Sequence, residues 1–401
     1  MAQAFSNIRI LDFTQVLAGP FAAQQLALLG AEVIKVEQPG EGDQMRRLIC
    51  SEEMGERGLS PSYLMCNMNK RGITIDLKAP EAKEMITRLI KECDVVIENF
   101  KAGAMDKLGF GYEFAKSIKP DIVYCSISGY GQKGPKAGVP AYDGAIQAAA
   151  GMMNVNGHPE TGPTRAGFFV VDMSTGLTAA LAISSALYRR RETGEGQHLD
   201  VAMMDSAMTI QGSRIVSHTV EGEEAQLEGN ESVTRQPTAN VFPTADGYLQ
   251  IAAIQQSQVE ALFGEIGIGA LLDDPRYADR AGRIEHCDYL KKEIATALRS
   301  DTAENWVHKL QAAKVPIAKI NRYSDVLQEP QLGHRDILVD VPGPASLGGS
   351  QKLVAAAYMA NADGPAVRHG APDLGQHTDE ILGEIGYSHS EIDAMRARGA
   401  I

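Results

Sequence analysis

The residues Ile8–Thr14 (IRILDFT) and Glu32–Glu37 (EVIKVE) are two short apolar runs rich in Ile and Val, and the helical pattern Pro20–Leu29 separates them. Two such strands joined by a helix are typical of a βαβ unit, which places its strands side by side in a parallel sheet. The alternation continues with an amphipathic helix and three further strands, Pro80–Glu92, Ile73–Leu77, Asp94–Phe100 and Ile122–Ser128. The sequence therefore predicts an α/β fold with a mainly parallel, Rossmann-like sheet.

The sequence changes in character after residue 213. Gly222–Gln236 is polar and acidic with weak periodicity, which indicates an exposed loop. A predicted hairpin follows, with its turn at Ala245–Gly247, and then helical patterns and the strand Val315–Ile320. The tail returns to strand-like segments and a final pair of helices. We expect a large α/β domain from residues 1–213 and 331–401, a linker at 214–224, and a smaller α+β domain at 225–330.

The composition excludes several classes of function. The chain has 401 residues, with 38 Lys and Arg against 51 Asp and Glu, which gives a formal net charge of −13. An acidic surface repels nucleic acids and anionic membranes, so we expect neither as a partner. No window approaches the roughly 18 unbroken apolar residues of a membrane span, and the first residues lack the cationic segment of a secretory signal. The five cysteines show no CxxC spacing and the nine histidines no HxxxH pair, so we expect a cytoplasmic protein without a metal site.

Asp172 is the candidate nucleophile. The apolar run before it predicts a strand at Phe168–Asp172 that turns into a helix over Ser174–Arg191, and ligands of open parallel sheets bind outside the carboxyl ends of strands. The free N–H groups of a helix start favour the charged form of a carboxylate, which can attack an activated acyl group to give a mixed anhydride. Alternatively, Asp172 only caps the helix, together with Ser174 and Thr175. The residues alone favour this structural role.

Glycines and cations mark the loops that follow the predicted strands. Gly129–Gly134 matches the dinucleotide fingerprint GxGxxG, but Pro135 and Pro140 come where a helix has to begin, so an irregular loop is favoured over a nicotinamide site. Several cations are consistent with an anionic cofactor at the same sheet edge, although solvated loops are the usual place for such residues: Lys70, Arg71, Lys101, Lys107, Lys133 and Lys136.

Several segments together resemble the class III CoA-transferases. They occur in the order expected for that family and span nearly the whole chain: Leu11–Pro20, Gly30–Glu37, Asn69–Arg71, Val96–Phe100, Ser128–Gly131, Pro140–Asp143, Asp172–Gly176, Thr193–Gln197 and Leu374–Asp379. The family includes formyl-CoA transferase, carnitine CoA-transferase and the related α-methylacyl-CoA racemases. The resemblance implies a large Rossmann-like domain built from both ends of the chain, an inserted small domain, and two subunits interlocked as a homodimer.

The resemblance also implies a mechanism in which Asp172 attacks the donor thioester. The product is an aspartyl acyl anhydride, which the released CoA thiolate converts to an aspartyl-CoA thioester before the acceptor carboxylate takes the CoA. Contacts to CoA are implied for Val16, Leu17, Ala18, Gln38, Ile75, Asp76, Leu77, Lys78, Asn99, Phe100, Lys101, Lys107 and Tyr142. Position 38, which can be Arg in the family, is Gln here, so Lys136 or Arg71 is expected to supply a phosphate contact.

Two departures from family patterns narrow the expected reaction. The glycine-rich loop of formyl-CoA transferase has no counterpart near Ile254–Gln258, so specificity for formyl or oxalate groups is not expected. The racemases use a His in the segment aligned with Val139–Asp143, where this chain has Pro140, Ala141 and Tyr142. We therefore expect a CoA-transferase that takes CoA from an acyl-CoA, with succinyl-CoA as the expected donor, to a small carboxylic acid. A 2-methylacyl-CoA racemase is the alternative, and a CoA-binding protein without catalytic activity is a further one.

Overall fold

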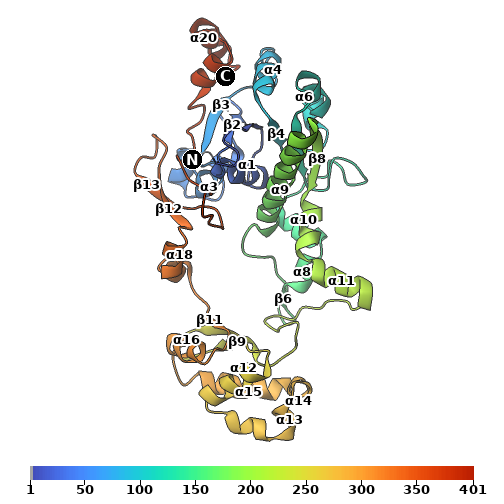
Figure 1. The fold of residues 1–401 in the computed structure, drawn as a ribbon, viewed down its shortest axis with the longest axis vertical. Helices are drawn as coiled ribbons and strands as arrows, with labels where there is room; N and C mark the ends of the chain where they lie inside the picture. The colour runs from blue at the N-terminus through green and yellow to red at the C-terminus, as the bar shows by residue number, and fades with distance from the viewer. Residues whose placement is uncertain (1–2) are drawn as a thin grey trace. The chain divides into compact units, whose positions relative to one another are not determined.

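The computed structural model describes residues 3–401 of the chain, which form two compact units. The large unit combines the chain up to Met152 with Arg165–Glu224 and Pro330–Ile401. The small unit combines Met153–Thr164 with Ala225–Glu329. Figure 1 shows the large unit running from the blue strands to the red C-terminal helices, because residues far apart in sequence share it.

Six parallel strands form the sheet of the large unit, in the order β3-β2-β1-β4-β5-β8. Their bounds are Arg9–Asp12 (β1), Glu32–Glu37 (β2), Lys70–Thr74 (β3), Val95–Glu98 (β4), Val123–Ser128 (β5) and Gln197–Ala202 (β8). In the register Ile10 of β1 lies opposite Val33 of β2 and Val95 of β4. The sheet confirms the predicted α/β class, and its order is that of a doubly wound fold.

Two strands differ from the sequence-based prediction. The third strand was expected at Ile73–Leu77, but β3 begins at Lys70, whose fully buried ammonium is bonded to Asp12. A lysine at the start of a run therefore belongs to the strand here because its charge has a partner inside the protein. The strand β8 was not predicted, since its residues QHLDVA mix polar and apolar side chains, as an edge strand with one exposed face does.

Helices cover both faces of the sheet. The helices α1 (Ala18–Leu28) and α9 (Val170–Thr193) pack on one face, against alternate strand residues such as Ile10, Val33 and Val123. The opposite face is covered by α4 (Ala82–Glu92), α6 (Tyr112–Ile118), α19 (Thr378–Glu384) and α20 (His389–Ala397), which contact residues such as Leu11, Ile34 and Val96. Figure 1 shows the red helix α20 near α4. α9 is long and apolar enough to span a membrane, but half of its apolar window is buried inside the protein.

The remaining elements of the large unit connect these layers. They are η1 (Gln44–Arg46), α2 (Glu52–Glu56), α3 (Pro61–Cys66), α5 (Ala104–Leu108), α7 (Asp143–Ala149), α10 (Met203–Ile210), α11 (Gly212–Glu221), α18 (Pro330–His334), β12 (Leu338–Pro342) and β13 (Ser350–Val354). The helix α11 occupies most of the segment that was predicted as a linker. The helix α8 (Met152–Val155) begins in the large unit and ends in the small one.

The small unit has its own apolar core around Leu249, Ile251 and Trp306. Its antiparallel sheet pairs β9 (Ala239–Pro243) with β10 (Tyr248–Ala252) and then β11 (Ile317–Lys319), so the predicted hairpin is confirmed. The other elements are β6 (Gly157–His158), β7 (Gly162–Pro163), α12 (Gln256–Glu265), η2 (Gly269–Asp273), α13 (Pro275–Ala278), α14 (Arg280–Glu285), α15 (Cys287–Leu298), α16 (Ala303–Ala312) and α17 (Tyr323–Val326).

Candidate active site

A pocket of about 360 Å³ opens at the carboxyl ends of the central strands of the large unit. The chain leaves β1 toward β2 and leaves β4 toward β5, so the loops after these two neighbouring strands diverge and leave a crevice between them. The pocket is lined by residues of both loops, by the loop after β5 and by three single residues: Gln15–Ala18, Asn99–Ala102, Ile127–Gly131, Gly138–Tyr142, Gln44, Asp172 and Met203. Lys101 is the one Lys or Arg among these lining residues of the described chain.

Asp172 enters the pocket from the first turn of α9, and not from the end of a strand. The strand predicted at Phe168–Asp172 is wrong, because α9 already begins at Val170. An apolar run of this length fits the buried start of a helix as well as a strand, and periodicity does not separate the two. The idea that Asp172 caps α9 is also wrong, because Phe169 occupies the N-cap position. The side chain of Phe169 makes no capping hydrogen bond.

Asp143 takes the role of the cap from a distant position in the sequence. Its Oδ2 accepts the backbone N–H groups of Val171 at 2.8 Å and of Asp172 at 3.0 Å, and its Oδ1 accepts a bond from Gln147 Nε2 at 2.6 Å. Asp143 is buried and lies at the start of α7. The N–H groups expected to favour the charged form of Asp172 are therefore already bonded to another carboxylate.

The pKa of Asp172 is raised from 3.8 to about 7, first because the carboxyl is buried and second because Asp143 carries a like charge nearby. This is the opposite direction from the one expected for a carboxylate that receives the N–H groups of a helix start. The carboxylate of Asp172 accepts no hydrogen bond from residues 3–401, so nothing offsets its burial. Conversion to a neutral acyl derivative removes this buried charge, which favours bond formation at its oxygen.

A close contact between helices places Asp172 beside the start of α1. Gly176 lies one turn after Asp172, and a Cβ atom there would come within 2.8 Å of the Ala18 carbonyl oxygen. The α1 start is part of the pocket lining, and no side chain in the described part of the molecule caps it. The first N–H groups of a helix bind negatively charged oxygen atoms. The pocket thus combines a nucleophile with donors suited to an oxyanion.

Seven residues expected to contact CoA line the same pocket as Asp172: Val16, Leu17, Ala18, Asn99, Phe100, Lys101 and Tyr142. The structure brings them together, while their contacts with CoA stay a prediction. Gln15 and Gln44 also line the pocket, and nothing in the sequence singled them out. Asp143 belongs to a segment that resembles the family, but its bond to a helix 28 residues away has no sequence signal.

The other expected contacts lie outside the lining of this pocket. Gln38, Lys78, Lys107 and Lys136 are exposed, and the Lys136 ammonium lies 4.9 Å from the ring centre of Tyr130 at the pocket edge. Ile75 is buried, while Asp76 and Leu77 are partly exposed after β3. Arg71 is bonded to Glu32 at 2.6 Å, Glu384 at 2.7 Å and Glu380 at 2.9 Å. Its charge is thus compensated, which makes it a weaker candidate for a phosphate than Lys136.

Comparisons with known proteins agree along the whole chain. The model of CoA-transferase family III matches residues 5–378. The acyl-CoA transferase of Fusarium pseudograminearum (strain CS3096) is 36% identical over 403 residues, which cover 99% of this chain and 88% of the relative. The succinate–glutarate CoA-transferase of Agrobacterium fabrum (strain C58 / ATCC 33970) is 34% identical over 386 residues, which cover 95% of each. A crystal structure of a CAIB/BAIF family protein from Brucella suis matches with a TM-score of 0.87 and 32% identity, covering 96% of this chain and all of the other. The chain therefore belongs to the CoA-transferase family III and is a class III CoA-transferase.

Proposed function

We propose that this protein transfers CoA from succinyl-CoA to a small carboxylic acid, with Asp172 as the covalent carrier. The observation that carries this proposal is the partly buried carboxylate of Asp172, which lies in the pocket without a hydrogen-bond donor from the described residues of the protein and has a pKa near neutrality. The donor is proposed from the relative of Agrobacterium fabrum, whose name states that it acts on succinate and glutarate.

The reaction balances without a proton transfer. An oxygen of Asp172 attacks the thioester carbonyl, and the C–S bond breaks. The CoA thiolate departs, and Asp172 is now part of an aspartyl acyl anhydride. The thiolate then attacks the side-chain carbonyl of Asp172, which forms the aspartyl-CoA thioester and releases succinate. The acceptor carboxylate attacks this thioester, the C–S bond breaks, and the CoA thiolate departs as a second anhydride forms. The thiolate then attacks the acceptor carbonyl of this anhydride, which gives the acceptor CoA thioester and restores the Asp172 carboxylate. Each tetrahedral intermediate carries an oxyanion, and we propose that the backbone N–H of Ala18 at the start of α1 stabilises it, since Ala18 lines the pocket and Pro20 has no N–H.

The make-up of the pocket favours transfer over the racemase alternative. Racemisation needs one base on each side of the α-carbon. The pocket-lining residues of the described chain include Asp172 but neither His nor Glu, and Tyr142 lies near the position where the racemases carry their His. A transferase, by contrast, needs one nucleophile and donors for an oxyanion. This is the set of groups that the pocket holds.

Trapping of the covalent intermediates tests the proposal. The protein is incubated with succinyl-CoA without an acceptor, and peptide mass spectrometry searches for CoA or, after hydroxylamine treatment, a hydroxamate on Asp172. Asp172→Asn should lose both adducts and all transfer to a panel of carboxylic acids. Asp205→Asn is a matched control, because Asp205 lies in the first turn of α10, is exposed and is not among the pocket-lining residues. Full transfer by Asp172→Asn contradicts the proposal, and binding of CoA without transfer to any acid supports the non-catalytic alternative.

A further inference from the structure

Side chains, and not neighbouring strands or helices, hold the backbone at Thr14–Val16. Five of the backbone N–H and C=O groups in these three residues form bonds of 2.7 to 2.9 Å to side chains. The partners are Asp12 for the Thr14 N–H, Lys35 for the Thr14 carbonyl, Asn99 for both groups of Gln15, and Asp43 for the Val16 N–H. The conformation of this loop is therefore set from outside the loop.

Val16 needs such a restraint because its backbone is left-handed, with φ at +69°. A β-branched residue rarely adopts this conformation, since its side chain is crowded there. Residues in such conformations persist where the surrounding structure over-determines them, and they cluster at functional sites. The bonds on either side of Val16 supply the restraint.

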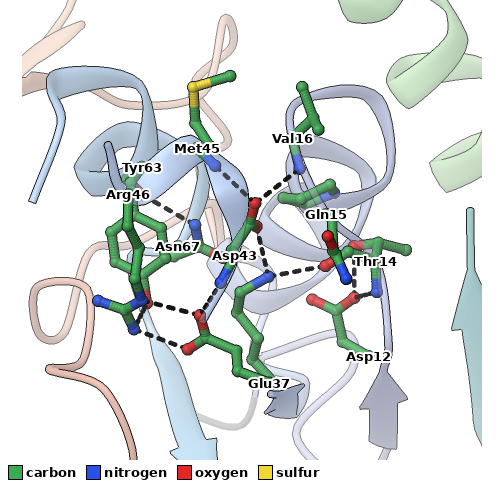
Figure 2. Close-up of polar contacts among 12 residues, drawn as sticks. Asp12, Thr14, Gln15, Val16, Glu37, Asp43, Met45, Arg46, Tyr63 and Asn67 are labelled. Atoms are coloured by element: carbon green, nitrogen blue, oxygen red, sulfur yellow. Dashed lines mark hydrogen bonds and ion pairs between the residues drawn. The ribbon is translucent and has the colours of Figure 1, made fainter. Parts of the chain in front are cut away.

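Asp43 and Lys35 restrain the loop as one unit, and Figure 2 shows the Asp43 carboxylate beside the backbone of Val16 and Met45. The Asp43 Oδ1 accepts the N–H groups of Val16 and Met45, each at 2.9 Å, and its Oδ2 accepts Lys35 Nζ at 2.9 Å. The same Nζ donates to the Thr14 carbonyl oxygen at 2.8 Å. Both side chains are fully buried, so no water competes for these bonds. The ion pair therefore forms hydrogen bonds to the backbone immediately before and immediately after Gln15.

This restraint reaches the pocket only through the backbone. Gln15, Val16, Leu17 and Ala18 line the pocket, whereas neither Asp43 nor Lys35 does. The loop also leads directly into α1, whose first residue, Ala18, lines the pocket as Asp172 does. A shift of Val16 therefore moves both a wall of the pocket and the start of this helix.

We propose that Asp43, acting with Lys35, is a positioning residue that holds Val16 in its left-handed conformation and so fixes the pocket wall that receives the acyl-CoA. The inference rests on the proposed function in one respect, namely that an acyl-CoA occupies this pocket. It goes beyond a stabilising role, because a buried ion pair alone is weak evidence for stability. The Asp43–Lys35 pair forms bonds to the loop at two points, Thr14 and Val16, and two such bonds fix the backbone that forms the pocket wall.

The test separates binding from folding with Asp43→Asn, whose single amide oxygen can accept the Val16 N–H or Lys35 Nζ but not both, and with a matched control. Glu37→Gln disrupts the buried Glu37–Arg46 pair in the same network, while its amide oxygen can still accept the Asp43 N–H, and Glu37 makes none of the bonds to Thr14–Val16. We expect Asp43→Asn to raise the KM for succinyl-CoA and the calorimetric Kd for CoA by about tenfold, with less than about threefold change in kcat. Glu37→Gln should leave KM and Kd unchanged. If Asp43→Asn only reduced the amount of folded protein, the apparent kcat would fall and KM would stay unchanged. That result overturns the inference.

Rescue by glycine is the second arm. Gly adopts a left-handed backbone without strain, so in a Val16→Gly background the effect of Asp43→Asn on KM should shrink to about threefold or less. An equal effect in both backgrounds contradicts the inference. If Asp43→Asn fails to fold, the double variant Lys35→Met with Asp43→Asn leaves no unpaired charge in this pair and should show the same rise in KM. If the unmodified protein binds neither CoA nor succinyl-CoA, the proposed function fails, whatever the variants do.

Discussion

Replacing Asp143 by Asn should lower the pKa of Asp172 and shift the pH dependence of transfer toward acid. The pKa of Asp172 stands at about 7 against 3.8 for an unperturbed aspartate, a rise of roughly three units, or about 4 kcal/mol against the charged form. Burial is the larger cause and the charge of Asp143 the second. The Asp143 share is therefore less than half, and we expect its removal to lower the pKa by about one unit. The substitution should leave α9 capped, because the amide oxygen of the new side chain still accepts helix N–H groups.

The expected change is measurable from kcat/KM, which reports ionisations of the free enzyme. With a pKa near 7, about a tenth of Asp172 is ionised at pH 6, and with a pKa near 6 about half is ionised. The ratio of kcat/KM at pH 6 to that at pH 8 should therefore rise by about fivefold in Asp143→Asn. Succinyl-CoA consumption, followed by chromatography of the CoA esters, provides the assay across pH 5 to about 9.

Glu98 requires a control, because burial raises its pKa to about 7 as well. The charges that act on Glu98 are those of Asp106 and Asp200, so Asp143→Asn should leave the Glu98 ionisation in place. Glu98→Gln then removes a competing titration without moving that of Asp172. A profile that is unchanged by Asp143→Asn, or that moves toward alkaline pH, refutes the reasoning.

Three further predictions concern stability and assembly. Asp172→Asn should raise the Tm near pH 8 but not near pH 4, which thermal unfolding at both pH values measures. The pKa of Asp172 is about 7 in the folded protein and 3.8 in the unfolded chain, so the wild-type protein loses up to about 4 kcal/mol of stability as the pH rises between these values, and the Asn variant does not. Gly176→Ala should lower the free energy of unfolding in urea by about 1–3 kcal/mol, because its Cβ would lie 2.8 Å from the Ala18 carbonyl oxygen and push α9 from α1. Leu181→Lys should lower the Tm in thermal unfolding, because Leu181 and Tyr188 leave an apolar stripe on α9 that is 69% and 68% exposed and that we expect a second copy of the chain to cover; in an interlocked dimer, loss of this contact weakens the assembly without releasing its subunits.

Each of these predictions has an outcome that contradicts it. Gly144→Ala is the matched control for Gly176→Ala, because Gly144 is also helical but has open space around it, so its substitution should cost nothing. Equal unfolding free energies for the two variants argue against close packing at Gly176. A Tm difference for Asp172→Asn that does not depend on pH removes the link to its ionisation. An unchanged Tm in Leu181→Lys shows that the α9 stripe is not a contact between copies.

The sequence was sufficient for the class of the fold, because β2 (EVIKVE) and β4 (VVIE) are short segments rich in Val and Ile that are separated by helical patterns. It failed where a distant partner decides the structure. Lys70 belongs to β3 because Asp12, 58 residues earlier, neutralises its buried charge. The strand predicted at Phe168–Asp172 failed for a related reason, since Asp143 caps the helix that actually begins there.

The candidate site was predictable in part for a topological reason. Loops that follow parallel strands meet at one edge of the sheet, so residues after β1, β4 and β5 gather around the pocket although they are distant in sequence. The raised pKa of Asp172 was not predictable, because it depends on burial and on the position of Asp143. The left-handed Val16 was equally hidden, since Val is among the residues least suited to that conformation.

The return of residues 330–401 to the large unit affects how the protein emerges from the ribosome. The helices α19 and α20 complete the core on one face of the sheet, against residues such as Ile86 and Leu89 of α4. About 150 residues separate Glu224 from α19, so at typical translation rates the part of that face under α19 and α20 stays uncovered for roughly ten to thirty seconds. A nascent chain with one face of its sheet still partly uncovered is expected to bind chaperones that recognise apolar surfaces during synthesis.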